Sequence, residues 1–105
     1  MMIESRSSGL GKNAEILLPA KANIIYVIHQ LVASYSLIVP GEPGRLTVDA
    51  HDEKIFDINF HCYAPFKEDH AFTAGEKNTS VLVMLHKVTG AFGKLNVIYE
   101  ERRTN

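Results

Sequence analysis

The alternation of apolar and polar residues between Leu46 and Cys62 constrains the fold more than any other feature of this chain. Successive side chains of a β-strand point to opposite faces, so each alternating run predicts a strand with one buried and one solvated face. Asp52 and Glu53 separate the two runs and predict a tight turn, which makes the pair a β-hairpin. The buried positions are Leu46, Val48 and Ala50 in the first run and Phe56, Ile58, Phe60 and Cys62 in the second.

Two further segments have the pattern of strands. The first is a short apolar run at residues 15–18 that Pro19 ends, as expected at a strand boundary. The second covers residues 95–100, where Leu95, Val97 and Tyr99 alternate with more exposed neighbours.

Two other segments have apolar residues at helical spacing. Between residues 20 and 36 the spacing is i, i+4, i+7 and i+11, which is one face of a helix. A second stripe follows Asn78, Thr79 and Ser80, any of which can cap a helix, and Gly90 or Gly93 can end it. The residues of the two stripes are Ile24, Ile28, Leu31 and Tyr35, and then Val81, Leu85, Val88 and Phe92.

The predicted order is therefore β-α-β-β-α-β. Two helices cannot cover both faces of a four-stranded sheet, so we expect an α+β fold, a two-layer α/β sandwich with both helices on one face of a mixed sheet. We assign residues 14–100 to this single domain, residues 1–13 to a flexible N-terminal lead-in and residues 101–105 to a charged tail. Residues 63–80 have no clear period and are predicted to form a long loop.

Composition narrows the class of function. The formal charge of −1 gives no electrostatic reason to expect nucleic acid or an anionic membrane surface as a partner. No apolar run approaches the ~20 residues that cross a bilayer. The single cysteine cannot form an internal disulfide, and the first 13 residues lack a secretory pattern, so we expect a cytoplasmic location.

Four segments of the sequence resemble, in their order, the characteristic motifs of a known protein family. Val27–Ser36 stands where that family has its Asn box, Arg45–Phe60 is similar to its hairpin, Asn78–Leu85 to its Gly-rich helix start, and Ala91–Val97 to its exit into the last strand. The family is the ATP-binding domain shared by sensor histidine kinases and anti-sigma-factor kinases. The element order also fits the generic ferredoxin-like layout, which hosts many unrelated functions.

The departures from the kinase family decide what the resemblance implies. The metal-coordinating Asn is absent, with His29 and Ala33 at the nearest positions, and residues 61–65 replace the box that reads adenine. Thr79–Leu82 replaces the Gly-rich helix start, where side chains would obstruct a phosphate. The resemblance therefore implies a degenerate, truncated ATPase-like domain that has lost its nucleotide site and binds no cofactor, and thus an adaptor or regulator.

No residue is poised for catalysis. Alternation puts His61 on the polar face of the hairpin and His51 at the end of its first strand, so these two could share a metal with His70, although scattered surface histidines are far commoner. His29 and His86 lie beside the predicted helical stripes and are most simply boundary residues. Cys62 follows the buried register and is most simply a small core residue.

The sequence therefore favours a non-catalytic regulatory or adaptor protein that acts by protein–protein interaction in cytosolic signalling. We expect the contacts on the predicted helix and on the loop 63–80, through Tyr63, Phe66, His70 and Phe72. A homodimer would bury the open sheet face. The alternative is a small ferredoxin-like enzyme or a ligand- or metal-binding protein that uses His51, His61 and His70 on that face.

Overall fold

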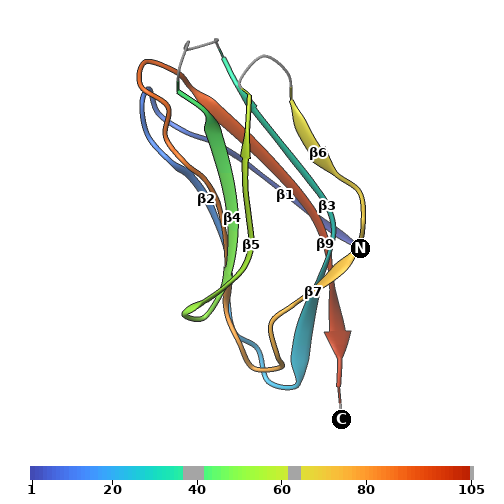
Figure 1. Cartoon of the computed structure of the whole chain (residues 1–105). Coiled ribbons are helices and arrows are strands. Elements are labelled where there is room, and N and C mark those ends of the chain that lie inside the picture. The colour runs from blue at the N-terminus through green and yellow to red at the C-terminus, as the bar shows by residue number, and fades with distance from the viewer. Residues whose placement is uncertain (37–41, 62–64, 105) are drawn as a thin grey trace.

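The computed structural model describes residues 1–36, 42–61 and 65–104, and the regular structure in these residues is β-strand throughout. Figure 1 shows the strands running along a common long axis in two layers. The strands are β1 (Met2–Ser7), β2 (Ala14–Leu18), β3 (Ile24–Tyr35), β4 (Gly44–Ala50), β5 (Glu53–Phe60), β6 (Phe66–Glu68), β7 (Phe72–Ala74), β8 (Val81–Leu85) and β9 (Gly93–Arg103).

The strands form two antiparallel sheets. We call the sheet with the order β1-β9-β3-β6, in which β7 also pairs with β3, sheet A, and the sheet with the order β2-β8-β4-β5 sheet B. Along the sequence the chain passes repeatedly from one sheet to the other. Among the described strands, β4 and β5 are the only consecutive pair that forms a hairpin within one sheet. If β6 and β7 are counted as one interrupted strand, this is the eight-stranded double-sheet arrangement called a jelly roll.

The core lies between the two sheets. Each sheet contributes every second residue of its strands, so the alternation that is visible in the sequence becomes one apolar layer of side chains. The largest fully buried side chains come from both sheets and include Ile16, Tyr26, Ile28, Leu31, Leu46, Val48, Val83, Leu85 and Leu95.

The helix predicted over residues 20–36 is wrong, because this segment is strand β3, paired along its length with β9. A β-bulge explains the misleading spacing. Ile28 pairs with Tyr99 and Gln30 pairs with Ile98, so His29 is an extra residue in β3. Inward positions therefore change from even to odd numbers at the bulge. The sequence Ile24, Ile28, Leu31, Tyr35 fits a helical period and a bulged strand equally well.

The helix predicted after Ser80 is also wrong, because residues 81–85 form strand β8 between β2 and β4. Val81 and Leu85 are four residues apart, a separation that lies on one face of a strand as well as on one face of a helix. The residue between them, Val83, is also fully buried, as alternation requires. Phe92, the last residue of the predicted helical stripe, is exposed.

The predicted fold class is thus overturned: the chain is not an α+β sandwich in the order β-α-β-β-α-β, and the kinase-like ATPase fold implied by the resemblance is wrong for the same reason. The ferredoxin-like layout needs the same two helices. The strands predicted at residues 15–18, 45–50 and 95–100 are confirmed, and so is the hairpin of β4 and β5.

Three other predicted segments contain strands. Residues 1–13, predicted to be a lead-in, include β1, which pairs with β9. Residues 63–80, predicted to be a loop, include β6 and β7, and β9 continues to Arg103 in the predicted tail. Within the described ranges, no helix is long and apolar enough to cross a membrane.

Candidate functional site

One long side of the sandwich is bordered by two sheet edges. Among the described residues, β5 pairs only with β4, and β6 and β7 pair only with β3. Figure 1 shows β5 and the β6–β7 segment running along the same side of the molecule, each at the edge of its own sheet. The core side chains of these edge strands are therefore covered by no further strand on that side.

Five aromatic rings fill the space between these edges. We call them the aromatic seam, and they are Tyr35, Phe56, Phe60, Phe66 and Phe72. The ring centroids follow one another at 5.8 Å from Tyr35 to Phe60, 5.4 Å from Phe60 to Phe66, 6.3 Å from Phe66 to Phe56 and 5.7 Å from Phe56 to Phe72. The seam is thus continuous along the second half of β5, from Phe60 to Phe56, and continues to Phe72 of β7.

Gly44 makes room for one end of the seam. It lies opposite Phe60 in the pairing of β4 and β5. A Cβ atom on Gly44 would lie 2.5 Å from a ring carbon of Tyr35 and 2.9 Å from a ring carbon of Phe60. A glycine at this position is therefore required by the stacking of the two rings. The Tyr35 hydroxyl also donates a hydrogen bond to the carbonyl of His86, at 2.7 Å, which ties this ring to sheet B.

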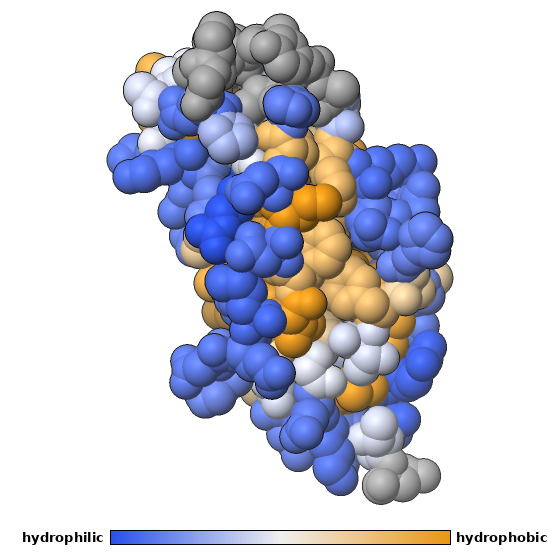
Figure 2. All heavy atoms as spheres, in the orientation of Figure 1, coloured by the Kyte–Doolittle hydropathy of each residue, from blue (hydrophilic) through white to orange (hydrophobic). Residues whose placement is uncertain are grey.

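The seam reaches the surface. All five rings are only partly buried, and Figure 2 shows a continuous apolar band on this face between two polar margins. Ile55 and Ile58 of β5 are likewise partly buried and pack against the same cluster. A contiguous exposed apolar patch with a polar rim is the usual mark of an interaction surface.

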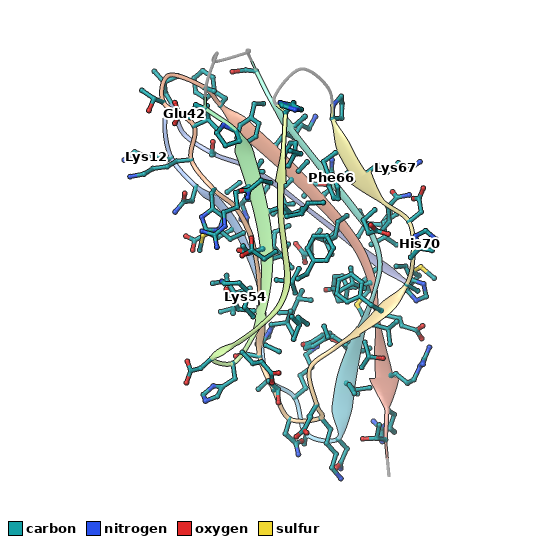
Figure 3. The ribbon with its side chains drawn as sticks, in the orientation of Figure 1. Lys12, Glu42, Lys54, Phe66, Lys67 and His70 are labelled. Atoms are coloured by element: carbon teal, nitrogen blue, oxygen red, sulfur yellow. The ribbon has the colours of Figure 1, made fainter. Side chains whose placement is uncertain are left out.

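Lys54, Lys67 and His70, the basic residues beside the seam, each lie next to a carboxylate on the same rim. Lys54 contacts Asp49 at 3.0 Å beside β5, and on the other rim Lys67 contacts Asp69 at 3.7 Å. His70 lies 2.9 Å from Glu68, and the hydrogen bonds from the side chain and backbone of His70 lower the pKa of the Glu68 carboxyl. Figure 3 shows Lys54 on the β5 side and Lys67 and His70 on the β6 side, with Phe66 between them.

The residues predicted from the sequence as contacts fall on this surface in part. Phe66 and Phe72 belong to the seam and His70 to its rim, whereas Tyr63 lies outside the described residues. Alternation in the sequence predicts that Phe56 and Phe60 lie on the buried face of a hairpin, whereas in the structure both rings are partly exposed. The signal available in the sequence was the excess of phenylalanine in two segments close together, residues 56–60 and 66–72.

The three histidines considered as metal ligands are not brought together. His51 is in the turn before β5 and His61 follows the end of β5, a separation on the order of 26 Å for eight residues at ~3.3 Å each. His70 lies between β6 and β7 beside Glu68. In the described part of the chain, no group of three or more His, Cys, Asp or Glu is placed to hold a metal ion. Cys62 lies outside the described residues.

The other two histidines make defined contacts on the outer faces of the sheets. His29, the bulge residue of β3, lies 2.7 Å from Glu100, and its hydrogen bond lowers the pKa of that carboxyl. His86 lies 2.9 Å from the hydroxyl of Thr47 on sheet B. Burial, followed by the nearby charges of Arg45 and Lys54, lowers the pKa of His86.

Compared with models of known protein families and with curated protein sequences, the chain matches none of them.

Proposed function

We propose that this chain is a non-catalytic adaptor or regulatory protein that acts in the cytosol by binding another protein along the aromatic seam. The observation that carries the proposal is the seam itself: five partly exposed rings in a row between two open sheet edges. Aromatic side chains supply large contact area at low conformational cost and are enriched at protein interfaces.

The shape of the surface favours an extended partner segment. β5 is an edge strand of eight residues, and an edge strand presents unpaired N–H and C=O groups that a further strand can use. A segment added beside β5 would place every second side chain over Phe56, Phe60 and Phe66. Such a segment has apolar residues at alternate positions.

The charges of the rims favour an uncharged partner. Lys54 and Lys67 already have carboxylate partners, as does His70, so a charged partner would have to displace an existing contact. Recognition then depends on apolar contact and on backbone pairing, with little electrostatic steering. The proposed partner is therefore an extended, apolar and uncharged segment of another protein.

A selection from a library of displayed random peptides tests this function. We expect peptides selected on the purified chain to carry apolar residues at alternate positions and few charges. Phe66→Gln should weaken their binding about tenfold or more, because a ring at the centre of the contact is lost. Phe66→Leu, which keeps an apolar side chain and the fold, should weaken it less.

A matched control distinguishes the seam from apolar exposure in general. Leu17 is 62% exposed on the outer face of sheet B, away from the seam, so Leu17→Gln should leave peptide binding unchanged. Loss of binding in Leu17→Gln but not in Phe66→Gln would contradict the proposal. Light scattering measures whether the chain forms a dimer through the seam. A dimer that dissociates in Phe66→Gln would show that the seam binds a second copy of this chain and not another protein.

A further inference from the structure

A hollow of about 370 Å³ lies at one end of sheet A, next to Tyr35, the ring at one end of the aromatic seam. It forms where the end of β1, the end of β3 and the start of β9 meet, and its lining consists of four serines with Tyr35, Phe92, Gly93 and Lys94. Its volume is at the small end of the ~300–1,000 Å³ range of ligand pockets. It is therefore large enough for a single sugar-sized ring.

The polar floor of the hollow is a row of three side chains across three strands. Lys94 of β9 lies opposite Ser7 of β1 on one side and Ser34 of β3 on the other. Residues that pair in this way share one face, with Cβ atoms about 4.5–5.5 Å apart. Within the described part of the chain, Lys94 has no carboxylate in salt-bridge distance, and neither serine hydroxyl is hydrogen-bonded.

The other two serines fix the frame of the hollow. The Ser36 hydroxyl accepts a hydrogen bond from the N–H of Phe92 at 2.9 Å, and the Ser8 hydroxyl accepts one from the N–H of Gly93 at 2.7 Å. The chain before Lys94 is thus held from both sides, by β3 and by the end of β1. The backbone that carries Phe92 and Lys94 is therefore held in place before any ligand binds, which lowers the backbone entropy lost on binding.

Phe92 supplies the apolar wall. Its side chain is 51% exposed, although it follows the buried Ala91 and precedes the buried Gly93. The face of an aromatic ring carries partial negative charge and attracts the positively polarised C–H bonds of a saturated ring. An ammonium and two free hydroxyls stand on the adjacent floor, so the hollow combines a ring platform, neutral hydrogen-bonding groups and one cation.

We propose that this hollow binds an acidic monosaccharide, a pyranose ring that carries a carboxylate. The ring packs its C–H face on Phe92, its hydroxyls bond to Ser7 and Ser34, and its carboxylate pairs with Lys94. A charge-assisted bond from the ammonium is the strongest single contact of the three. This inference goes beyond the protein-binding function proposed for the seam, and Tyr35 borders both sites.

Titration of the ¹⁵N-labelled chain with glucuronate, glucose and acetate tests the proposal by NMR. These three probes separate the ring from the charge. We expect glucuronate to shift the amide signals of Ser7, Phe92 and Lys94 at millimolar concentration, and to bind about tenfold tighter than glucose or acetate, because only glucuronate combines the ring contact with a charge-assisted hydrogen bond.

Two variants locate the effect. Lys94→Gln should lower the affinity for glucuronate about tenfold, to that of glucose, while Lys77→Gln, an exposed lysine in the loop between β7 and β8, should not change it. Phe66→Gln in the seam should not change it either. Equal affinity for acetate and glucuronate, equal affinity for glucose and glucuronate, or no shift of these signals would each overturn the proposal.

Discussion

The hydroxyl oxygen of Thr47 lies 2.9 Å from Nε2 of His86, and Thr47 is only 1% exposed. This pair sits on the outer face of sheet B, where the ion pair of Arg45 and Asp57 lies beside it. The hydrogen bonds from Arg45 lower the pKa of the Asp57 carboxyl. The Thr47 side chain thus connects β4 to His86, the residue that follows β8.

We predict that Thr47→Val lowers the free energy of unfolding by about 1 kcal/mol, because the shape is kept while His86 loses its partner. Urea denaturation measures the effect. Thr73→Val is the matched control, since Thr73 is exposed on β7, and its change should stay within about 0.5 kcal/mol. Equal effects of the two substitutions would contradict the importance of the Thr47 contact.

Acidification should destabilise the chain through His86. Its pKa is lower in the folded state than its ordinary value of 6.5, so the folded chain binds fewer protons there than the unfolded chain. The free energy of unfolding is therefore fully retained above that value and falls as the pH drops from 6.5 toward the folded-state pKa. Unfolding measured between about pH 7 and about pH 5 should show this loss.

The variant His86→Gln has no such proton to bind and should lose less stability over the same range. The carboxyls with a lowered pKa affect the free energy of unfolding in a lower pH range. The stability they add is lost only below their ordinary pKa values of 3.8 for Asp57 and 4.5 for Glu68 and Glu100. An unchanged pH profile in His86→Gln would exclude His86 as the cause.

The seam should also contribute to stability. Phe66→Ala removes a partly buried ring that contacts Phe56 and Phe60, and we predict a loss of about 2 kcal/mol. Phe92→Ala removes an equally large ring that is half exposed, and its effect should stay within about 0.5 kcal/mol. Thermal and urea unfolding of both variants measure the difference, and a larger loss in Phe92→Ala would contradict the seam as the closing layer of the core.

Gly44 offers a second test of the same packing. Gly44→Ala places a methyl group against the rings of Tyr35 and Phe60, which cannot both move away, and we predict a loss of about 1–3 kcal/mol. Gly9→Ala is the control, because the nearest atoms there belong to the flexible side chain of Lys12 at 3.3 Å. A Gly44→Ala variant as stable as the parent chain would show that the two rings do not stack as described.

The β-bulge of β3 predicts opposite results for two single-residue deletions. Deletion of His29 removes the extra residue and leaves Ile28 and Leu31 facing the core, so the chain should still fold and lose only the surface contact to Glu100. Deletion of Val27 would instead turn Ile28 outward and bring His29 into the core, at about 3 kcal/mol or more. Circular dichroism and urea unfolding distinguish the two, and equal damage by both deletions would contradict the bulged strand.

The strands that the sequence predicted correctly are those whose alternation is unbroken. In β2, β4, β5 and β9 the buried and exposed positions alternate with few exceptions, and each strand was predicted within a few residues of its bounds. The two helix predictions failed where the pattern is ambiguous. A bulge at His29 and the four-residue separation of Val81 and Leu85 each imitate a helical period.

Other parts of the fold leave little trace in the sequence. β1 is an edge strand in which Glu4 and Arg6 pair with the buried residues Val97 and Leu95, so two of its inward positions are polar and the alternation is obscured. β6 and β7 have three residues each, too few for a period. The sequence predicts Phe66 and Phe72 as contact residues. Their packing against Phe56 depends on two strands from opposite sheets lying side by side, and no local sequence pattern predicts that arrangement.

Chemical-shift mapping of the ¹⁵N-labelled chain with a selected apolar peptide tests the central claim most directly. We predict that the largest amide shifts lie in β5, β6 and β7, along both edges of the aromatic seam, and that they disappear in Phe66→Gln. Shifts concentrated on β1, β2 or the outer faces of the two sheets, with the seam unaffected, would contradict it.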